Sequence, residues 1–598
     1  MHDNQQLRSE VLRTTSQVAD WKDSRSLVLL NKLLELEEPY ITPKMVDYLY
    51  QQGVTEKMVS FITQAGSANA RPGRNDDSSQ SHEMKLAYKA VIILTCDEPS
   101  EATLNYLGKV AQTIVREIFD IFKDDSAGSF YHAYRIIGCL LRNFPTDVYE
   151  ALCNDGKLPE RMSAIFRYIG HTPVSELLVM IVALTPLPRA SQLYLISAKS
   201  RWTFFEQLNQ WDFMLKLTQI VVRPADICHL GHICSAEQHS NASCLAIQEL
   251  IEKLSLEDMG EILFQSIGFT PALLDSLVDA IIDDQCDPCI RRSCCRLINF
   301  IIKSASEPEI FCFFGQQVGA TVSVSNRFHS IRANVTNAIR RWMPQLAGML
   351  KMFHSNADDE PSSESYKYSS YVIHRPFSVL RSYLMELIVL AVETDCAVAA
   401  LVSSDLWKIM FKWTVIYAHN NIYHSMIYRL IFAILRGNDS ATQSTLLQDA
   451  GLIRLITDYF VAYPNREDCV YKTQSTDVVN KSMVRGFLLK CANLIRLQSK
   501  HASATPFLVE FLGNNKEWAD FEPTLITATS IQINFGMGIR VDDNHTKMNH
   551  NVASLMHMTP ESKSYESELG LGSWYSKSIG FVDDADTDGA MSPASMID

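Results

Sequence analysis

The stretch RPFSVLRSYLMELIVLAVETD, residues 375–395, carries the pattern that decides the fold. Its apolar residues recur at intervals of three and four: Phe377, Leu380, Leu384, Leu387, Ile388 and Ala391. This spacing places them on one face of an α-helix. Pro376 precedes these six apolar residues and is interpreted as a first-turn proline. The stretch therefore predicts a helix with one face buried against a core.

Similar apolar blocks recur along most of the chain, from LVLLNKLLELEE near residue 27 to EPTLITATSIQ near residue 522. Short polar or proline-containing segments separate them, and alternating strand patterns are nearly absent. A long series of helix, turn and helix buries each apolar face against the next pair, as solenoids do. We therefore predict an all-α, armadillo/HEAT-like helical-repeat solenoid.

The composition also predicts where this helical domain begins and ends. It is expected to span residues 21–532, after a polar N-terminal segment of residues 1–20. Residues 65–83 and 354–370 are rich in serine and charge, and they are predicted to be flexible loops within it. Residues 533–598 lack apolar periodicity and end in the acidic FVDDADTDGAMSPASMID. They are predicted to form a disordered tail.

Charge and hydropathy limit the classes of partner. The chain has 598 residues, of which 47% are hydrophobic and 20% charged, with a net charge of −14. An excess of acidic residues opposes nonspecific binding to nucleic acid and to anionic lipid. The N-terminus lacks the pattern of a secretory signal, and the apolar runs are too short to span a bilayer. We expect a cytoplasmic protein, present also in the nucleus, that neither binds nucleic acid nor inserts into a membrane.

The segment CHLGHICSAEQHSNAS, residues 228–243, is the first candidate metal site. Its cysteines and histidines are Cys228, His229, His232, Cys234 and His239. Structural zinc sites usually use two pairs of ligands separated by enough chain to fold back around the ion, and these residues are crowded into one loop. Ser240 and Asn241 are favoured helix N-caps. A helical face follows them: Cys244, Ile247, Ile251 and Leu254. We interpret the segment as a helix start with Cys244 in the core, and no metal is expected.

The second candidate is CDPCIRRSCC, residues 286–295, with Cys286, Cys289, Cys294 and Cys295. A redox CxxC motif opens a helix after a strand, and no strand is predicted here. An apolar helical stripe passes through the segment: Ile290, Cys294, Leu297 and Ile301. Cys294 is therefore predicted to be buried. Common catalytic and cofactor-binding motifs are not found in the sequence, so we expect a protein that is not an enzyme and has no cofactor.

Five stretches carry a resemblance to a known family. They are VIILTCDEP (residues 91–99), RMSAIFRYIGHTPVSELLVMIVALT (161–185), HSNASCLAIQELI (239–251), MFKWTVIYAHNNIYHSMIYRLIFAIL (410–435) and FLGNNKEWADFEPTLI (511–526). In this order they resemble blocks of the SAPS family, the regulatory subunits of the type-six serine/threonine protein phosphatase. The resemblance covers about residues 21–525. Loops 65–83 and 354–370 have no counterpart in it, and the tail is short for the family.

The resemblance implies a noncatalytic scaffold that binds the type-six phosphatase catalytic subunit and directs it to substrates. An ankyrin-repeat subunit is a further partner that it implies, and cell-cycle progression is the process to which family members are linked. The alternative is an armadillo-like adaptor for transport or vesicle tethering, unrelated to a phosphatase. It would share the helical class and bind another cargo.

The fourth block contains the residues singled out as partner-binding: Asn420, Asn421 and His424. They are expected at a turn and the following helix start, where amide groups face a partner. The alternative is that Asn421 caps a helix of residues 422–435 while Asn420 and His424 stabilise the turn.

The same choice applies in the first block to Leu94, Thr95, Cys96 and Asp97. The functional interpretation is again that these residues contact a partner. The alternative is that Asp97 caps a helix that starts near Ser100.

Overall fold

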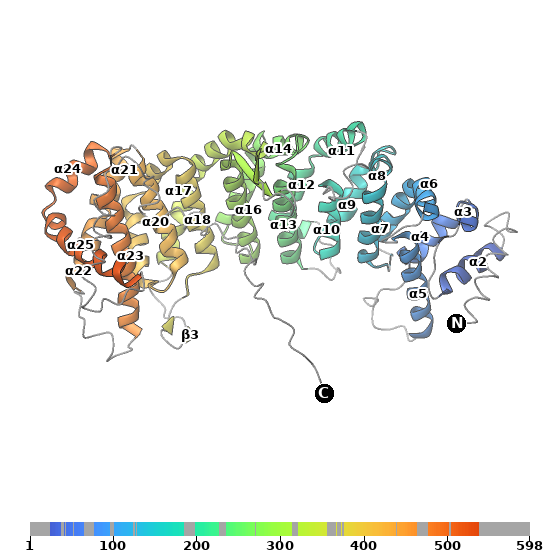
Figure 1. Cartoon of the computed structure of the whole chain (residues 1–598), viewed down its shortest axis with the longest axis horizontal. Coiled ribbons are helices and arrows are strands. Elements are labelled where there is room, and N and C mark those ends of the chain that lie inside the picture. The colour runs from blue at the N-terminus through green and yellow to red at the C-terminus, as the bar shows by residue number, and fades with distance from the viewer. Residues whose placement is uncertain are drawn as a thin grey trace, which may run out of the picture. The chain divides into compact units, whose positions relative to one another are not determined.

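The computed structural model describes residues 24–36, 41, 43–51, 53–64, 77–95, 101–123, 126, 128–183, 198–226, 235–269, 271–313, 321–355, 366–367, 372–373, 376–437, 439–462, 476–501 and 504–536. The chain divides into two compact units. Unit 1 comprises residues 1–364 and 374–409, and unit 2 comprises residues 365–373 and 410–598. The elements are labelled in chain order in Figure 1.

Unit 1 contains these α-helices: α2 (Ser24–Glu35), α3 (Pro43–Leu49), α4 (Val54–Gln64), α5 (Asp77–Leu94), α6 (Glu101–Ile118), α7 (Phe130–Asn143), α8 (Pro145–Cys153), α9 (Leu158–Arg167), α10 (Thr172–Val182), α11 (Ala198–Gln210), α12 (Phe213–Val222), α13 (Ala236–Leu254), α14 (Gly260–Phe269), α15 (Pro271–Ile282), α16 (Pro288–Ser306), α17 (Arg332–Ser355) and α18 (Val379–Thr394). Short 3-10 helices are η1 (Phe119–Phe122), η2 (Pro224–Asp226), η3 (Arg327–Ile331) and η4 (Cys396–Leu401). Strands β1 (Glu309–Phe313) and β2 (Thr321–Ser325) form an antiparallel hairpin that pairs Glu309 with Ser325 and Phe313 with Thr321.

Helix α19 (Ser404–Ile416) runs from unit 1 into unit 2. Unit 2 then contains α20 (Asn421–Arg436), α21 (Ser440–Ser444), the π-helical turn η5 (Thr445–Asp449), α22 (Leu452–Ala462), α23 (Thr476–Ser499), α24 (Pro506–Asn514) and α25 (Lys516–Gly536). It also holds the short antiparallel pair β3 (Tyr366–Lys367) and β4 (Val372–Ile373). Helix α23 packs against α20, α22 and α25, so it forms the centre of this unit.

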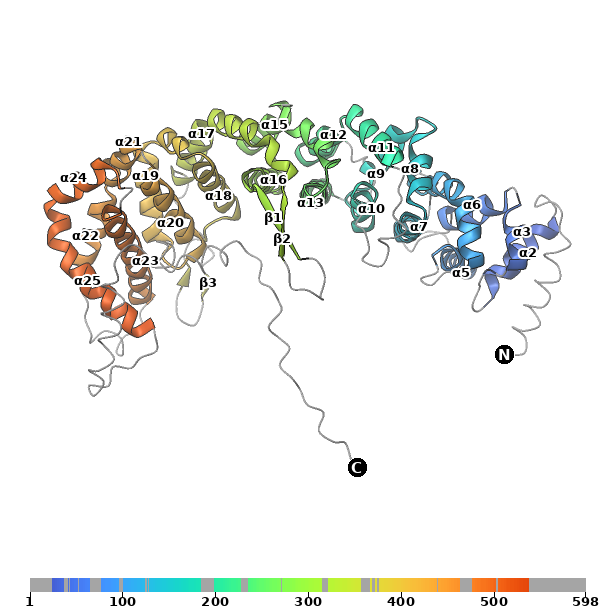
Figure 2. The same ribbon diagram turned by 45° about the horizontal axis from the view of Figure 1, so that its top comes forward.

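The helices of unit 1 form two layers. In one layer α5, α7, α10, α13, α16 and α18 pack side by side in chain order, and Figure 2 shows this succession. In the other layer α4, α6, α8, α11 and α14 follow one another in the same way. Each helix of the series buries its apolar face against neighbouring helices of its own layer and of the other layer. The predicted all-α, armadillo/HEAT-like helical-repeat fold is confirmed.

Helix α18 contains the stretch that predicts this fold. Ser378 caps its N-terminus through the backbone N–H of Arg381, so Pro376 lies before the helix and is not a first-turn proline. The later members of the predicted stripe are buried: Leu384, Leu387, Ile388 and Ala391. Phe377 precedes the helix and is partly exposed. The periodicity predicted the buried face correctly, and the hydroxyl of Ser378 decided where the helix begins.

Helix α13 begins five residues before the predicted caps Ser240 and Asn241. Its N-cap is Ser235, whose side chain accepts a hydrogen bond from Gln238 while the Gln238 side chain accepts one from the Ser235 backbone. Ser240 lies inside the helix, and its hydroxyl donates to the carbonyl of Val221 at 2.7 Å. The predicted caps are therefore wrong, because a complete capping box at Ser235 satisfies two backbone groups and extends the helix. The predicted core face is confirmed: Cys244, Ile247, Ile251 and Leu254 are buried.

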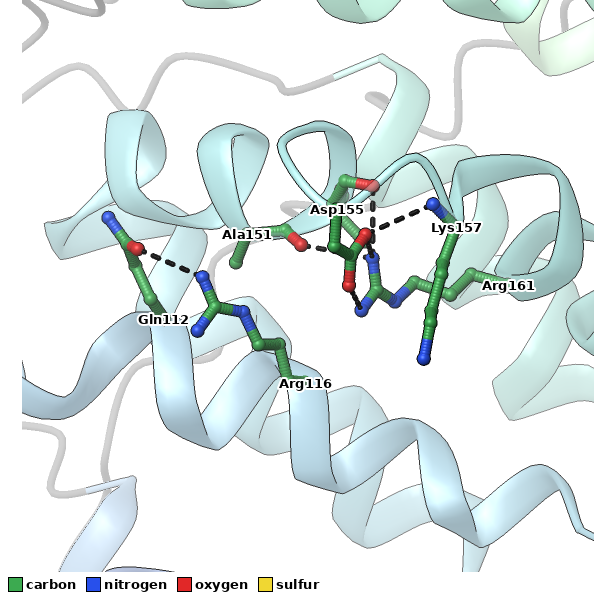
Figure 3. A network of polar contacts seen from close by, with 7 residues as sticks. Gln112, Arg116, Ala151, Asp155, Lys157 and Arg161 are labelled. Carbon is green, nitrogen blue, oxygen red and sulfur yellow. Dashed lines mark hydrogen bonds and ion pairs between the residues drawn. The ribbon is translucent and has the colours of Figure 1, made fainter.

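Buried arginines close two of the turns between successive helices. Arg161 of α9 donates to the carbonyls of Ala151 and Leu152 at the end of α8, at 3.0 and 3.1 Å, and Figure 3 shows its neighbourhood. Arg291 of α16 donates in the same way to the carbonyl of Ile281 in α15, at 2.9 Å. The last carbonyls of a helix lack partners within it, so a guanidinium from the next helix fixes the two together.

Several predicted boundaries differ from the structure. Helix α5 begins at Asp77, inside the predicted loop 65–83, because the polar residues after it include good helix formers. Within the predicted loop 354–370, α17 continues to Ser355 and β3 occupies residues 366–367. Helix α25 continues to Gly536, four residues past the predicted domain end. The predicted N-terminal segment 1–20 and residues 537–598 of the predicted tail lie outside the described residues.

The two hairpins also depart from the expectation that strands are nearly absent. The β1 and β2 sequences, EIFCF and TVSVS, are rich in aromatic and β-branched residues, which favour strands. Among the described helices, none combines the length and apolarity that crossing a bilayer requires.

Candidate functional site

The α19–α20 connection holds the three residues singled out as partner-binding. Asn420 is the N-cap of α20, since its side-chain oxygen accepts a hydrogen bond from the backbone N–H of Tyr423 at 3.0 Å. Asn421 is the first residue of the helix and is exposed. The cap predicted at Asn421 is therefore one residue off. The side-chain oxygen of Asn420 is thus engaged at the helix end, whereas the side chain of Asn421 is exposed to a partner.

His424 lies inside unit 2. Its Nε2 donates to the carbonyl of Thr414 at 3.0 Å, because a carbonyl oxygen accepts only. Its ring stacks on Phe487 of α23, with the ring centres 4.6 Å apart. Burial lowers the pKa of His424. His424 thus joins α19, α20 and α23, which agrees with the interpretation that it stabilises the turn and not with direct contact to a partner.

Three aliphatic side chains at the same connection face solvent. Val415 and Ile416 at the end of α19 are 41% and 39% exposed, and Ile422 in the first turn of α20 is 71% exposed. Together with Asn421 we call these residues the α19–α20 patch. Large exposed aliphatic groups beside an exposed amide are typical of protein-contact surfaces. Ile422 is not among the residues predicted to contact a partner, because helical periodicity alone does not distinguish it from its buried neighbours.

The second predicted group consists of Leu94, Thr95, Cys96 and Asp97, and the structure describes only the first two. Leu94 is fully buried, and Thr95 is buried with its hydroxyl donating to the carbonyl of Val91 at 2.7 Å. Cys96 and Asp97 lie outside the described residues. Leu94 therefore contributes to packing. Thr95 forms part of the wall of a cavity against α7 and α10.

A larger cavity lies in unit 2 between α22, α23 and α25. Its volume is about 710 Å³. The rings of Phe460 and Phe521 meet edge to face beside it, and the Arg485 guanidinium lies 4.4 Å from the centre of the Phe460 ring. Asp458 and Asp520 also line it. The lining thus combines aromatic rings and carboxylates with a guanidinium that already lies against the Phe460 ring.

The predicted Cys/His cluster is only partly described. Cys228, His229, His232 and Cys234 lie outside the described residues. His239 lies in the first turn of α13, with Nδ1 3.1 Å from the carbonyl of Ser235 and Nε2 2.9 Å from the carbonyl of Arg167. Both ring nitrogens face backbone oxygens, so neither faces an open metal position. Within the described ranges, no group of three or more His, Cys, Asp and Glu side chains could hold a metal ion.

The four cysteines of CDPCIRRSCC are free thiols around the start of α16. Asp287 caps the helix by accepting from the backbone N–H of Cys289 at 2.7 Å, which leaves Cys286 and Cys289 partly exposed. Cys294 and Cys295 are buried, as predicted for Cys294. Burial raises the pKa of Cys295 to about 12 and that of Cys294 well above the ordinary value. Since the thiolate is the reactive form, these two thiols are core residues.

Comparison with known proteins gives no family. No protein-family model and no curated protein matches the chain. Among solved structures, Uso1-2 is similar over 90% of this chain and 86% of its own, with 10% identity and a TM-score of 0.29. Kap121p bound to Nup53p is similar over 87% of this chain and 56% of its own, with 11% identity and a TM-score of 0.21. Kap121p bound to Ste12p gives 87% and 59%, with 12% identity and a TM-score of 0.20.

Proposed function

We propose that this chain is a noncatalytic regulatory subunit that binds a type-six protein phosphatase catalytic subunit and directs it to substrates. The observation that carries the proposal is the order of five SAPS-like blocks over residues 91–526. Described parts of these blocks form the end of α5, helices α9 and α10, part of α13, helices α19 and α20, and parts of α24 and α25. The blocks thus span both units of the helical-repeat domain.

The architecture suits this role for a physical reason. A helical array buries one set of side chains in its core and leaves the outer positions of every helix to vary without unfolding. Such an array offers separate surfaces for a catalytic subunit, for substrates and for a third subunit of ankyrin-repeat type. We propose that it acts in the cytoplasm and the nucleus, in processes linked to the cell cycle.

Within unit 2, we propose that the α19–α20 patch contacts the catalytic subunit. Ile422 is the residue that argues for it, since its side chain is 71% exposed in a helix whose neighbouring Tyr423 is fully buried. Exposing a large aliphatic group costs hydration free energy that a protein partner recovers by covering it. Asn421 supplies an amide next to it for orientation.

Affinity purification of the tagged full-length chain from its native cells, followed by quantitative mass spectrometry, tests the proposal. We expect the type-six catalytic subunit at close to equal amounts. Ile422→Asp should reduce its recovery about tenfold, since a charge in an apolar contact costs at least about 1.4 kcal/mol. Val509→Asp is the matched control, because Val509 is a 50% exposed aliphatic residue of α24 outside the patch.

The outcomes separate the two parts of the proposal. Recovery of transport or tethering proteins without a phosphatase would contradict the function and favour the adaptor alternative. A phosphatase that is recovered equally with Ile422→Asp and Val509→Asp would keep the function and exclude the α19–α20 patch as the contact.

A further inference from the structure

One face of α7 carries an uncommon combination of residues. Tyr131, Tyr134, Arg135, Gly138 and Arg142 are spaced by three, one, three and four positions, so they lie on the same side of the helix. All five line a cavity with a volume of about 210 Å³. Thr95, which directly follows α5, and Met180 of α10 complete the wall. We call this space the Tyr/Arg cavity. Figure 2 shows α7 between α5 and α10.

Among the described residues, the two arginines have no counter-charge there. Arg135 and Arg142 lie two helical turns apart on α7, and the described residues that line the cavity include no carboxylate. Within the described part of the chain neither guanidinium forms an ion pair. The whole chain has a net charge of −14, so carboxylates are abundant elsewhere. Two cations held near one cavity repel each other until an anion lies between them. Guanidinium groups present several N–H donors in a plane and are well suited to oxyanions.

The charge of Arg135 also affects the pKa of a neighbouring histidine on α7. Burial and then the charge of Arg135 lower the pKa of His132, on the same helix. Among the described residues, no ion pair neutralises the charge of Arg135.

The remaining walls decide what kind of oxyanion fits. The rings of Tyr131 and Tyr134 stack with centres 6.3 Å apart, and they bring hydroxyl groups that can donate to an oxygen of the ligand. The hydroxyl of Thr95 already donates to the carbonyl of Val91, so Thr95 lines the cavity without offering a hydrogen-bond donor to a ligand. Gly138 lies between the arginines, and a Cβ there would come within 3.1 Å of the Met180 sulfur. The absence of a side chain at Gly138 thus lets Met180 of α10 pack closely against α7 at the wall of the cavity.

The size argues against a nucleotide or another large cofactor. Sites for such ligands usually have volumes of about 300–1,000 Å³, and the Tyr/Arg cavity is smaller. A short phosphorylated side chain is of the right size. Its phosphoryl group carries a charge of about −1.5 to −2 and three acceptor oxygens, which match two guanidiniums and two phenols better than the two oxygens of a carboxylate do.

We propose that the Tyr/Arg cavity binds the phosphoryl group of a phosphorylated serine or threonine in a partner protein. The partner segment lies across α5, α7 and α10 with the modified side chain pointing between Arg135 and Arg142. Tyr131, which is 53% exposed, provides an aromatic surface beside the entry for the neighbouring residue of the segment. This inference does not rest on the proposed phosphatase partner, because it concerns binding by the isolated chain.

The test uses the purified full-length chain and a fluorescent peptide library with a central phosphoserine and degenerate flanking residues. Fluorescence anisotropy compares it with libraries that carry serine or glutamate at the same position. We expect the phosphoserine library to bind on the order of tenfold more tightly than the serine library. One or two charge-assisted hydrogen bonds account for a difference in affinity of this size. Added salt should weaken this binding, because the arginines are partly exposed.

Substitutions then assign the binding to the cavity. The double variant Arg135→Gln/Arg142→Gln should remove the preference for phosphoserine. Arg116→Gln should keep it, since Arg116 is an exposed arginine of α6 that bonds only to Gln112. If the double variant does not fold, Arg142→Gln alone and Gly138→Val provide the test. Arg142 is exposed, and a valine at position 138 would displace the Met180 side chain that lines the cavity.

Four results would overturn the proposal. The first is equal affinity for the phosphoserine and serine libraries, and the second is a preference that survives Arg135→Gln/Arg142→Gln. The third is displacement of the peptides by inorganic phosphate at equal concentration, which would assign the cavity to the free ion. The fourth is binding of vesicles containing phosphoinositides by a chain that does not bind the phosphoserine library.

Discussion

Asp155 and Arg161 form a two-point ion pair across the turn between α8 and α9. Nη1 of Arg161 lies 2.7 Å from Oδ1 of Asp155, and Nη2 lies 2.5 Å from Oδ2. Oδ1 also accepts from the backbone N–H of Lys157 at 3.1 Å, as Figure 3 shows. Asp155 therefore holds the guanidinium at the end of α8, where the same Nη1 also donates to the carbonyls of Ala151 and Leu152. Successive helices are joined here by charge as well as by apolar packing.

Replacing Arg161 by methionine should destabilise unit 1. The variant keeps much of the apolar stem and leaves the carbonyls of Ala151 and Leu152 without their donor. We expect a loss of about 2–3 kcal/mol in the free energy of unfolding, the range for unsatisfied buried acceptors and a broken, partly buried pair. Urea denaturation followed by circular dichroism measures it. Arg116→Met, at an exposed site, is the control and should change stability little.

The same pair gives a pH dependence at acid pH. The hydrogen bond from Arg161 is the main reason that the pKa of Asp155 is lowered. A lowered folded-state pKa stabilises the fold above the ordinary aspartate pKa of about 3.9, and this contribution is lost as the pH falls through the folded pKa. Asp155→Asn should thus cost stability at pH 7 and much less at pH 3. A difference from the unsubstituted chain that is constant from pH 7 to pH 3 would contradict this assignment.

His424 should produce a second pH dependence, nearer neutrality. Burial lowers its pKa, so below about pH 6.5 the unfolded chain takes up a proton that the folded chain excludes. Stability therefore falls as the pH drops from about 6.5 toward the folded pKa. His424→Gln should reduce that slope while keeping a donor for the Thr414 carbonyl. Unfolding free energies at pH 5.0 to 7.5 provide the measurement.

Asn420 and Asn421 should behave differently although they are adjacent. Asn420→Ala removes the N-cap of α20 and should cost about 1 kcal/mol. Asn421→Ala, at an exposed first-turn position, should change stability by less than about 0.5 kcal/mol. Urea denaturation of both variants distinguishes the capping roles. Equal losses would mean that the cap is shared. A selective effect of Asn421→Ala on recovery of the catalytic subunit would assign Asn421 to the partner contact.

The thiols near the start of α16 should react at different rates. Cys286 and Cys289 are partly exposed, whereas Cys294 and Cys295 are buried. The pKa of all four thiols is raised above the ordinary value, and burial raises that of Cys295 to about 12, so the expected difference in rate comes mainly from access to the reagent. Brief treatment with iodoacetamide at pH 8, followed by peptide mass spectrometry, should label Cys286 and Cys289 well before the other two. All four should react at similar rates after unfolding in urea. Early labelling of Cys294 in the native chain would show that α16 does not pack as described.

The sequence by itself determined the helical class and much of the core. Apolar residues at intervals of three and four mark the buried faces of α13, α16 and α18, and Cys244 and Cys294 are buried where the pattern put them. This information is local, because a helix has the same period wherever it packs. The helix starts were predicted less accurately than the buried faces, because several neighbouring polar residues can each cap the same helix. Ser235 preceded Ser240, and Asn420 preceded Asn421.

Tertiary structure decided which surface groups face a neighbour and which remain exposed. His424 and Ile422 are two residues apart, yet His424 stacks on Phe487 from α23 while Ile422 is exposed. The Tyr/Arg cavity likewise needs Thr95, Arg135 and Met180, which come from three segments that are separate in the chain. The periodicity of a single helix does not predict these contacts between side chains of different segments. They depend on how neighbouring helices pack, and packing is set by side chains distant in sequence.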